Sequence, residues 1–166
     1  GVKAVKRGAS GSPGELRGDF DLTRDLGLLY ANTECGIFGV LPQENRPEAV
    51  GEAIPVARRT EVRTGKAVIL ANCRGDEVCA YEIEIEKLYG GSAPTRNLLL
   101  RVTDPALIAL TGGIVQGMSG SPIVQDGKLV GAVTHVLLDD PQRGYGILAE
   151  NMLSASGMTA QSAASA

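Results

Sequence analysis

The segment from Ile123 to Val133 constrains the fold more than any other part of the chain. It runs from apolar residues through Asp126-Gly127 into a second apolar stretch. An Asp-Gly pair between two apolar runs is the strongest short-range signal for a β-hairpin. Comparable short stretches, separated by turn residues, recur along the chain, which has 22 glycines and only 4% aromatic residues. This pattern predicts an all-β sandwich or barrel with little helix.

The expected strands are short and evenly spaced. Apolar and acidic residues alternate without a break over residues 81–86, so that strand should bury one face and expose the other. Helix is expected only as one turn at residues 150–156. We expect strands at residues 2–6, 15–19, 27–31, 36–41, 67–73, 78–88, 98–103, 122–125, 128–135 and 144–149.

Charge and composition exclude several classes of protein. Charged residues make up 21% of the 166 residues and the net charge is −3, so no basic surface indicates nucleic-acid binding. The chain has no long apolar run and no basic-then-apolar start, so we expect neither a membrane span nor an export peptide. With one histidine and no Cys-x-x-Cys, no metal site and no cofactor are expected.

Two interpretations of the cysteines stay open. Cys73 and Cys79 flank the turn-forming segment 74–78, so they could form a disulfide across a hairpin in an oxidising compartment. Alternatively, these two and Cys35 are small buried apolar side chains.

The run Gly117-Met118-Ser119-Gly120-Ser121-Pro122 indicates a nucleophilic serine. An acyl-transfer serine must be accessible, and backbone N–H groups must point at the oxyanion that forms. Gly117 and Gly120 allow positive φ angles and close approach of a substrate. The strand-to-helix nucleophile elbow requires G-x-S-x-G, but position 121 is Ser and a strand follows, which argues against an α/β-hydrolase.

These residues resemble the serine-site segment of chymotrypsin-like peptidases. On that resemblance, the N–H groups of Gly117 and Ser119 form the oxyanion hole, and Thr134 and His135 line the substrate cleft. Met118 stands where trypsin-type enzymes have an aspartate that pairs with a new N-terminus, so that activation switch should be absent.

A closer resemblance, over most of residues 1 to 153, is to the stage-four sporulation protein B peptidase family. It implies a chymotrypsin-like double β-barrel in which residues 1–92 are the remainder of the first barrel and the connection. Residues 93–156 would then be the second barrel with the serine site, and 157–166 a flexible tail. The stretches that carry the resemblance are 11–18, 32–39, 111–122 and 131–136.

The same resemblance implies that the catalytic histidine lies upstream of Gly1. A strand at residues 2–6 with no preceding turn is consistent with a chain that begins within the fold. In the family, a PDZ-type domain and a membrane anchor lie further upstream. The chain as given should therefore hydrolyse peptides poorly or not at all, since loss of a triad member lowers turnover by up to about 10⁶.

The other members of a triad have competing interpretations. Asp104 precedes Ser119 at the end of an apolar strand, and the family resemblance identifies it as the triad aspartate. An Asp before a Pro is equally an ordinary turn former. His135 is the only histidine, but it follows the serine, so we interpret it as a cleft or packing residue rather than the general base.

The leading hypothesis is a serine endopeptidase that cleaves a membrane-bound regulator of an intramembrane protease during spore formation, with its own chain as a further candidate substrate. The family places it in the space between the two membranes of the developing spore, and membrane attachment would come only through the absent upstream anchor. The alternative is a catalytically silent peptide-binding module. A plainer third possibility is a β-barrel whose Gly-Ser-rich loop is only a turn, which a buried Ser119 would favour.

Overall fold

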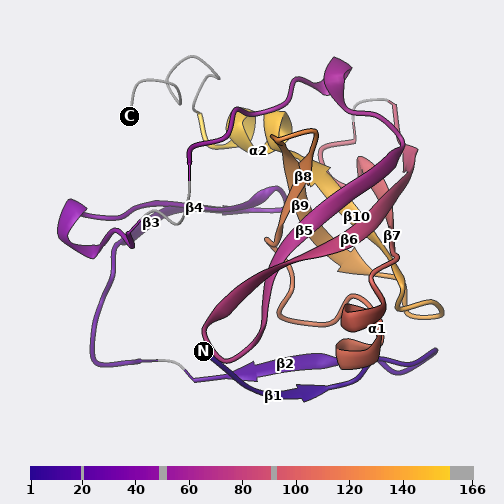
Figure 1. Ribbon diagram of the computed structural model, residues 1–166. Helices are drawn as coiled ribbons and strands as arrows, with labels where there is room; N and C mark the ends of the chain where they lie inside the picture. The colour runs from indigo at the N-terminus through magenta and orange to yellow at the C-terminus, as the bar shows by residue number, and fades with distance from the viewer. Residues whose placement is uncertain (20, 49–51, 91–92, 158–166) are drawn as a thin grey trace.

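A closed antiparallel barrel forms the centre of the computed structural model, which describes residues 1–19, 21–48, 52–90 and 93–157 (Figure 1). Around the barrel the strand order is β10-β7-β6-β5-β8-β9, so the chain closes the sheet by joining β9 to β10. The all-β expectation is confirmed. The barrel strands are β5 (Gly65–Arg74), β6 (Glu77–Leu88), β7 (Leu98–Val102), β8 (Pro122–Gln125), β9 (Lys128–Val136) and β10 (Arg143–Leu148).

The barrel interior is filled by one side of each strand. In β6, Ile83 and Ile85 are buried, while Glu84 and Glu86 lie on the outer face and form ion pairs with Arg101 of β7. The strand is therefore half-buried, as its alternating sequence predicts. The largest side chains with almost no exposed surface also include Ile69, Leu98, Leu100, Leu107, Met118, Ile123 and Ile147.

Two hairpins precede the barrel as separate two-stranded sheets. The first pairs β1 (Val2–Lys6) with β2 (Glu15–Gly18), and it lies at the same end of the barrel as α1 (Figure 1). The second pairs β3 (Leu28–Thr33) with β4 (Gly36–Val40) and projects away from the barrel (Figure 1). Short 3₁₀ helices occupy Gln43–Asn45 and Arg59–Glu61 in the connection to β5.

Two short α-helices complete the described chain. The helix α2 (Ala149–Ala155) coincides closely with the expected turn at 150–156. The helix α1 (Pro105–Thr111) was not predicted and corrects the expectation for this segment. Asp104 caps its N-terminus, Pro105 occupies the first turn and Gly112 ends it with a φ of 82°. These are the usual residue types at helix ends, and here they stabilise only seven residues.

The expected division between residues 92 and 93 falls between β6 and β7, which are neighbouring strands of the one closed barrel. Both sides of that boundary thus contribute strands to the same sheet. Residues 91 and 92 lie outside the described residues, as does most of the expected tail, residues 158–166.

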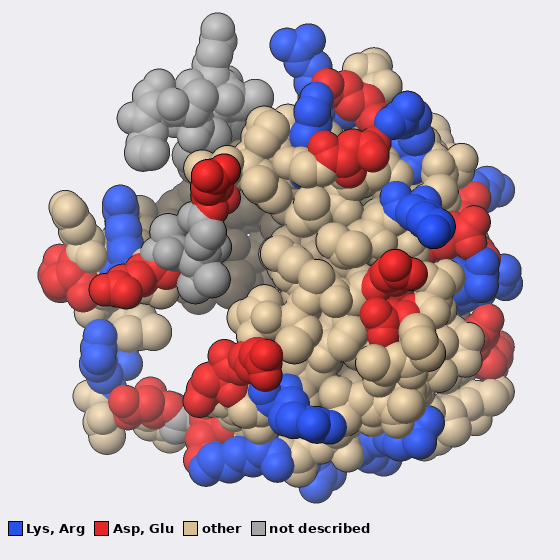
Figure 2. All heavy atoms as spheres, viewed as in Figure 1, with Lys and Arg blue, Asp and Glu red and all other residues tan. Residues whose placement is uncertain are grey.

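The described surface carries charges of both signs (Figure 2). Acidic and basic side chains are interspersed on the face drawn in Figure 2, without a large basic patch. No helix in the described ranges is long and apolar enough to cross a bilayer. Cys35, Cys73 and Cys79 are free thiols. Burial raises the pKa of the Cys73 thiol, which keeps it protonated and unreactive at neutral pH.

Candidate active site

Two successive β-turns present Ser119. The Met118 N–H donates to the Val115 carbonyl at 3.1 Å, and the Ser121 N–H donates to the Met118 carbonyl at 3.0 Å. Gly117 and Gly120 hold the third positions of these turns, with φ of 97° and 91°. Type II turns require a positive φ at that position. The two glycines are therefore needed for the backbone path, as the sequence predicts.

Ser119 is exposed at the beginning of the second turn, and its hydroxyl donates to the Thr134 carbonyl of β9 at 2.9 Å. The turn is fastened to the same strand on both sides. The Gly120 N–H donates to the Val133 carbonyl at 2.8 Å, and the Val133 N–H donates to the Ser121 carbonyl at 3.0 Å. A buried serine would have favoured a purely structural turn, so this exposure keeps a chemical role open.

The N–H groups of Gly117 and Ser119 are unpaired. Among the described residues, neither donates a hydrogen bond, although the neighbouring N–H groups of Met118, Gly120 and Ser121 all do. Two free amides beside an exposed hydroxyl are the donors that a developing oxyanion needs. Their role as an oxyanion hole stays a prediction of the family resemblance.

Met118 packs inside the barrel and is only 1% exposed. It belongs to the same core as Val115 and Leu107. The loop is thus anchored by an apolar side chain at the position where trypsin-type enzymes have their aspartate. Burial of this side chain therefore helps to fix the path of the loop.

Asp104 serves as the N-cap of α1. Its Oδ1 accepts hydrogen bonds from the N–H groups of Ala106 and Leu107 at 2.8 and 3.1 Å, and its Oδ2 accepts one from the Glu82 N–H at 3.2 Å. Burial raises the pKa of the Asp104 carboxyl, but the hydrogen bonds from Leu107, Glu82 and Ala106 lower it by more, so this pKa lies below its ordinary value. Within the described chain, no hydrogen bond joins Asp104 to Ser119.

Thr134 and His135 lie on β9 beside the serine turn. The Thr134 hydroxyl donates to the Tyr145 carbonyl at 3.1 Å, at an irregularity in the pairing of β9 with β10. The His135 side chain is exposed and, in the part of the chain that the structure describes, makes no hydrogen bond or ion pair. This exposure argues against a buried packing role, and the cleft assignment of His135 stays a prediction.

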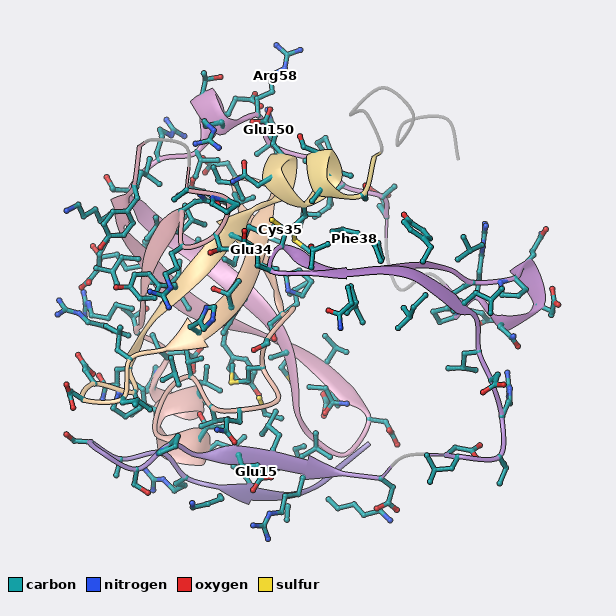
Figure 3. All side chains as sticks on the ribbon, turned by 180° about the vertical axis from the view of Figure 1, so that it is seen from behind. Glu15, Glu34, Cys35, Phe38, Arg58 and Glu150 are labelled. Atoms are coloured by element: carbon teal, nitrogen blue, oxygen red, sulfur yellow. The ribbon has the colours of Figure 1, made fainter. Side chains whose placement is uncertain are left out.

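An apolar cavity of about 410 Å³ adjoins the serine turn at Gly120 and was not predicted. It lies between the β3–β4 hairpin, strands β8 and β9, and α2, with Tyr30, Phe38 and Leu129 among its walls. Figure 3 shows Glu34 and Cys35 at the hairpin tip beside the barrel, and Phe38 on the same hairpin near α2. The apolar residues at 28–41 were the available signal, but a strand pattern does not reveal what its outer face will meet.

The described residues contain no group of three or more His, Cys, Asp or Glu side chains that could hold a metal ion. The chemistry available at the serine turn is that of a hydroxyl and two backbone amides.

Comparison with known proteins agrees with this fold. The family model described as SpoIVB peptidase S55 matches residues 1–153. The inactive form of the Rv3671c protease of M. tuberculosis is similar, with a TM-score of 0.52 and 21% identity over 79% of this chain and 67% of that chain. Its active form has a TM-score of 0.54 and 19% identity over 93% of this chain and 69% of that chain. No match was found among curated protein sequences. From the barrel, the serine turn and the match over almost the whole length, the chain belongs to the SpoIVB peptidase S55 family.

Proposed function

We propose that this chain carries the nucleophile and the oxyanion hole of a serine endopeptidase, and that its general base comes from a separate upstream segment. The observation that supports this most directly is the exposed Ser119 hydroxyl beside the unpaired N–H groups of Gly117 and Ser119. In the reaction, Ser119 Oγ attacks the scissile carbonyl, and the two amides stabilise the negative charge that develops on its oxygen.

The missing partner is the group that removes the proton from Ser119. A serine hydroxyl is a weak nucleophile until an adjacent base accepts its proton. Here that proton points at the Thr134 carbonyl, which is not a base, and among the described residues no hydrogen bond joins the His135 side chain to Ser119. The chain as given is therefore expected to hydrolyse peptides poorly, and an arriving histidine would replace the carbonyl as acceptor.

The proposed docking site of the upstream segment is the β3–β4 hairpin together with the cavity beside Gly120. Leu28 is 81% exposed and Ile37 is 64% exposed, although both lie in strands. Large apolar side chains clustered on an uncovered sheet mark a surface that another segment covers. A histidine segment packed on this hairpin would lie next to the cavity wall at Gly120, immediately after the nucleophile.

Asp104 remains the proposed triad carboxylate, on the family resemblance, alongside its role as a helix cap. The substitution Asp104→Asn separates the two roles, because Asn is an equally good N-cap but carries no charge. A triad role predicts a loss of about 10⁴ in kcat, whatever stability is lost with the carboxylate that accepts the Glu82 N–H. A purely structural role predicts unchanged kcat.

Thr134 and His135 are proposed to line the substrate cleft, because they follow the part of β9 that fastens the serine turn. The proposed substrate is a membrane-bound regulator of an intramembrane protease, with the enzyme's own chain as a further candidate. The proposed location is the space between the membranes of the developing spore. The family name supports a role in sporulation.

A fluorophosphonate probe tests the proposal against the alternative of a catalytically silent peptide-binding module. The probe is applied to the chain as given and to a longer form in which the family's histidine segment precedes Gly1, each with Ser119→Ala as control. Labelling of Ser119 in the longer form only is the expected result. Absence of labelling in both forms would favour the silent module, and robust hydrolysis by the short form would make His135 the base.

A further inference from the structure

The β1–β2 hairpin is hydrogen-bonded to the loop that leads into Ser119. The Gln116 N–H donates to the Gly14 carbonyl at 3.0 Å, and the Leu16 N–H donates to the Gln116 carbonyl at 2.8 Å. Glu15 and Gln116 form an isolated parallel bridge. Figure 3 shows Glu15 on this hairpin, at the end of the molecule opposite α2. Residues 14–16 of the first hairpin thus bind Gln116, the residue immediately before Gly117.

The Leu16–Gln116 hydrogen bond fixes the orientation of one particular peptide unit. The carbonyl of Gln116 and the N–H of Gly117 belong to the same peptide bond, and in a planar trans peptide these groups point in opposite directions. Because the carbonyl points at Leu16 of β2, the Gly117 N–H must point away from β2. That N–H is one of the two unpaired amides beside Ser119.

This peptide unit has an accessible alternative orientation. Type I and type II turns differ chiefly by a flip of the peptide between the two central residues, which here joins Gln116 to Gly117. The φ of 97° at Gly117 corresponds to the type II form. Glycine adopts φ of either sign with similar ease, so Gly117 itself does not determine the orientation.

We propose that the Leu16 N–H is the positioning group of the oxyanion hole, and that the β1–β2 hairpin thereby controls whether Ser119 can act. This rests on the proposed function, since it assigns the Gly117 N–H to a developing oxyanion. Leu16 itself touches no substrate. It acts through the Gln116 carbonyl, and loss of its N–H frees the peptide to flip and removes one oxyanion donor.

Close packing holds the Leu16 donor in place. A Cβ on the buried Gly14 would lie 2.5 Å from the Gly8 nitrogen and 2.5 Å from Val115 Cγ1, so hairpin and loop meet in direct contact. The hairpin is also tied to α1, because the Gly8 N–H donates to the Thr111 carbonyl at 2.8 Å. Because the hairpin and the serine loop are in direct contact, a shift of the hairpin displaces the Gln116 carbonyl that Leu16 binds.

The test compares three changes at position 16. Leu16→Pro removes the N–H, and because that N–H bonds Gln116, no donor is taken from the β1–β2 ladder. A backbone ester at residue 16, introduced as the α-hydroxy analogue of leucine, removes the same N–H and keeps the side chain. Leu16→Ala is the matched control, because it keeps the N–H and truncates the side chain.

The first readout needs no catalysis. Residual dipolar couplings of the Gly117 N–H in the chain as given report the direction of that bond. We expect the orientation to be kept in Leu16→Ala and to be lost or reversed in the ester and in Leu16→Pro. An unchanged Gly117 orientation in the ester variant would overturn the inference, whatever the activity of the enzyme.

The second readout links the orientation to turnover, in the longer form that carries the histidine segment. Loss of one oxyanion donor should lower kcat by about 10² to 10³ with KM little changed. The ester variant should show this drop and Leu16→Ala should retain at least tenfold higher kcat. Equal kcat values in the ester variant and in Leu16→Ala would refute the inference. The proposed function would still stand if Ser119→Ala abolished the activity of the longer form. A parent insensitive to Ser119→Ala would instead refute the proposed function.

Discussion

The barrel and the β3–β4 hairpin use apolar residues in opposite ways. In the barrel, Ile69 and Ile85 are 0% exposed and lie among side chains from the other strands. In the hairpin, Leu28 and Ile37 are mostly exposed, although the strands are paired just as regularly. Hydrogen bonding alone thus gives a sheet in both regions, but only the barrel has both a sheet and a core.

The candidate site is divided in the same way between the buried barrel and the exposed β3–β4 hairpin. The barrel side supplies the hydroxyl and two amides that are free among the described residues, on a loop that is bonded to β9 and to Leu16 of β2 and anchored by the packing of Met118. The hairpin side supplies an apolar wall beside Gly120, and the described lining of that cavity contains no histidine or carboxylate. On the proposed function, the barrel side carries the nucleophile and the oxyanion donors, and the exposed sheet is where the upstream segment would dock.

The largest expected difference between the two regions is in the free energy of unfolding that is lost when an isoleucine is truncated to alanine. Ile85→Ala should lower the free energy of unfolding by about 2 to 5 kcal/mol, because it leaves a cavity in the barrel. Ile37→Ala, the matched change in the hairpin, should alter it by less than about 0.5 kcal/mol. Urea denaturation of both variants measures this, and equal losses would show that the hairpin has a core of its own.

If the upstream segment covers the hairpin, the difference in stability loss between Ile85→Ala and Ile37→Ala should become smaller. In the longer form with the histidine segment, Ile37→Ala should become destabilising by at least about 1 kcal/mol, because its side chain is then removed from water. The measurement is the same denaturation experiment. An Ile37→Ala effect that stays near zero in the longer form would mean that the upstream segment docks elsewhere.

The contact between the first hairpin and the serine loop should tolerate no added volume. Gly14→Ala places a methyl group 2.5 Å from backbone and side-chain atoms, which should destabilise the protein by about 1 to 3 kcal/mol. Gly90→Ala is the control, because nothing lies within 4 Å of its Cβ position. Thermal unfolding compares the two, and a neutral Gly14→Ala would show that the hairpin is free to move.

The cap of α1, at the same end of the barrel, should make a smaller, pH-dependent contribution. Asp104→Ala should lower the free energy of unfolding by about 1 kcal/mol at neutral pH. Because the folded pKa of Asp104 lies below its ordinary value, the charged form stabilises the fold above the ordinary pKa of 3.8, and this stabilisation is lost as the pH falls through the lower folded pKa. Denaturation at several pH values, with Asp104→Asn as reference, measures the change. A difference that grew on acidification would have the wrong sign.

The smallest effect should come from the ion pairs on the outer face of the barrel. Glu86 lies between Arg101 and Arg143, with Nε to carboxylate oxygen distances of 2.8 and 3.0 Å. Both arginines are substantially exposed, so Arg143→Ala should lower stability by at most about 1 kcal/mol and less in high salt. A salt-independent loss would indicate packing of the side chain instead.

Most of the fold could be predicted from the sequence because its strands are bounded by turn residues and alternate in polarity. The predicted segments at 2–6 and 122–125 match β1 and β8, and the others differ by a few residues at their ends. The helix α1 was missed because Asp104-Pro105 was interpreted as a turn or a catalytic acid, and its seven residues are too few for a clear periodicity. Strand order and barrel closure depend on contacts between distant segments, which no local pattern contains.

The serine turn could be predicted for a similar reason, since Gly117 and Gly120 are required by the positive φ angles of two adjacent turns. The cavity beside Gly120 and the bond from Leu16 to Gln116 could not. Both form between elements separated by many residues, and neither involves a residue type that marks a site. What the sequence reveals is the chemistry carried by one loop, whereas the partners of that loop emerge only from the fold.

The most direct test of the central claim is the rate at which a fluorophosphonate labels Ser119 in the chain with and without the family's histidine segment. The account predicts slow or undetectable labelling of the chain as given, rapid labelling once the segment is present, and none in Ser119→Ala. Rapid labelling of the chain as given, abolished by changing His135 to Ala, would contradict it, because the base would then lie on β9 and the site would already be complete.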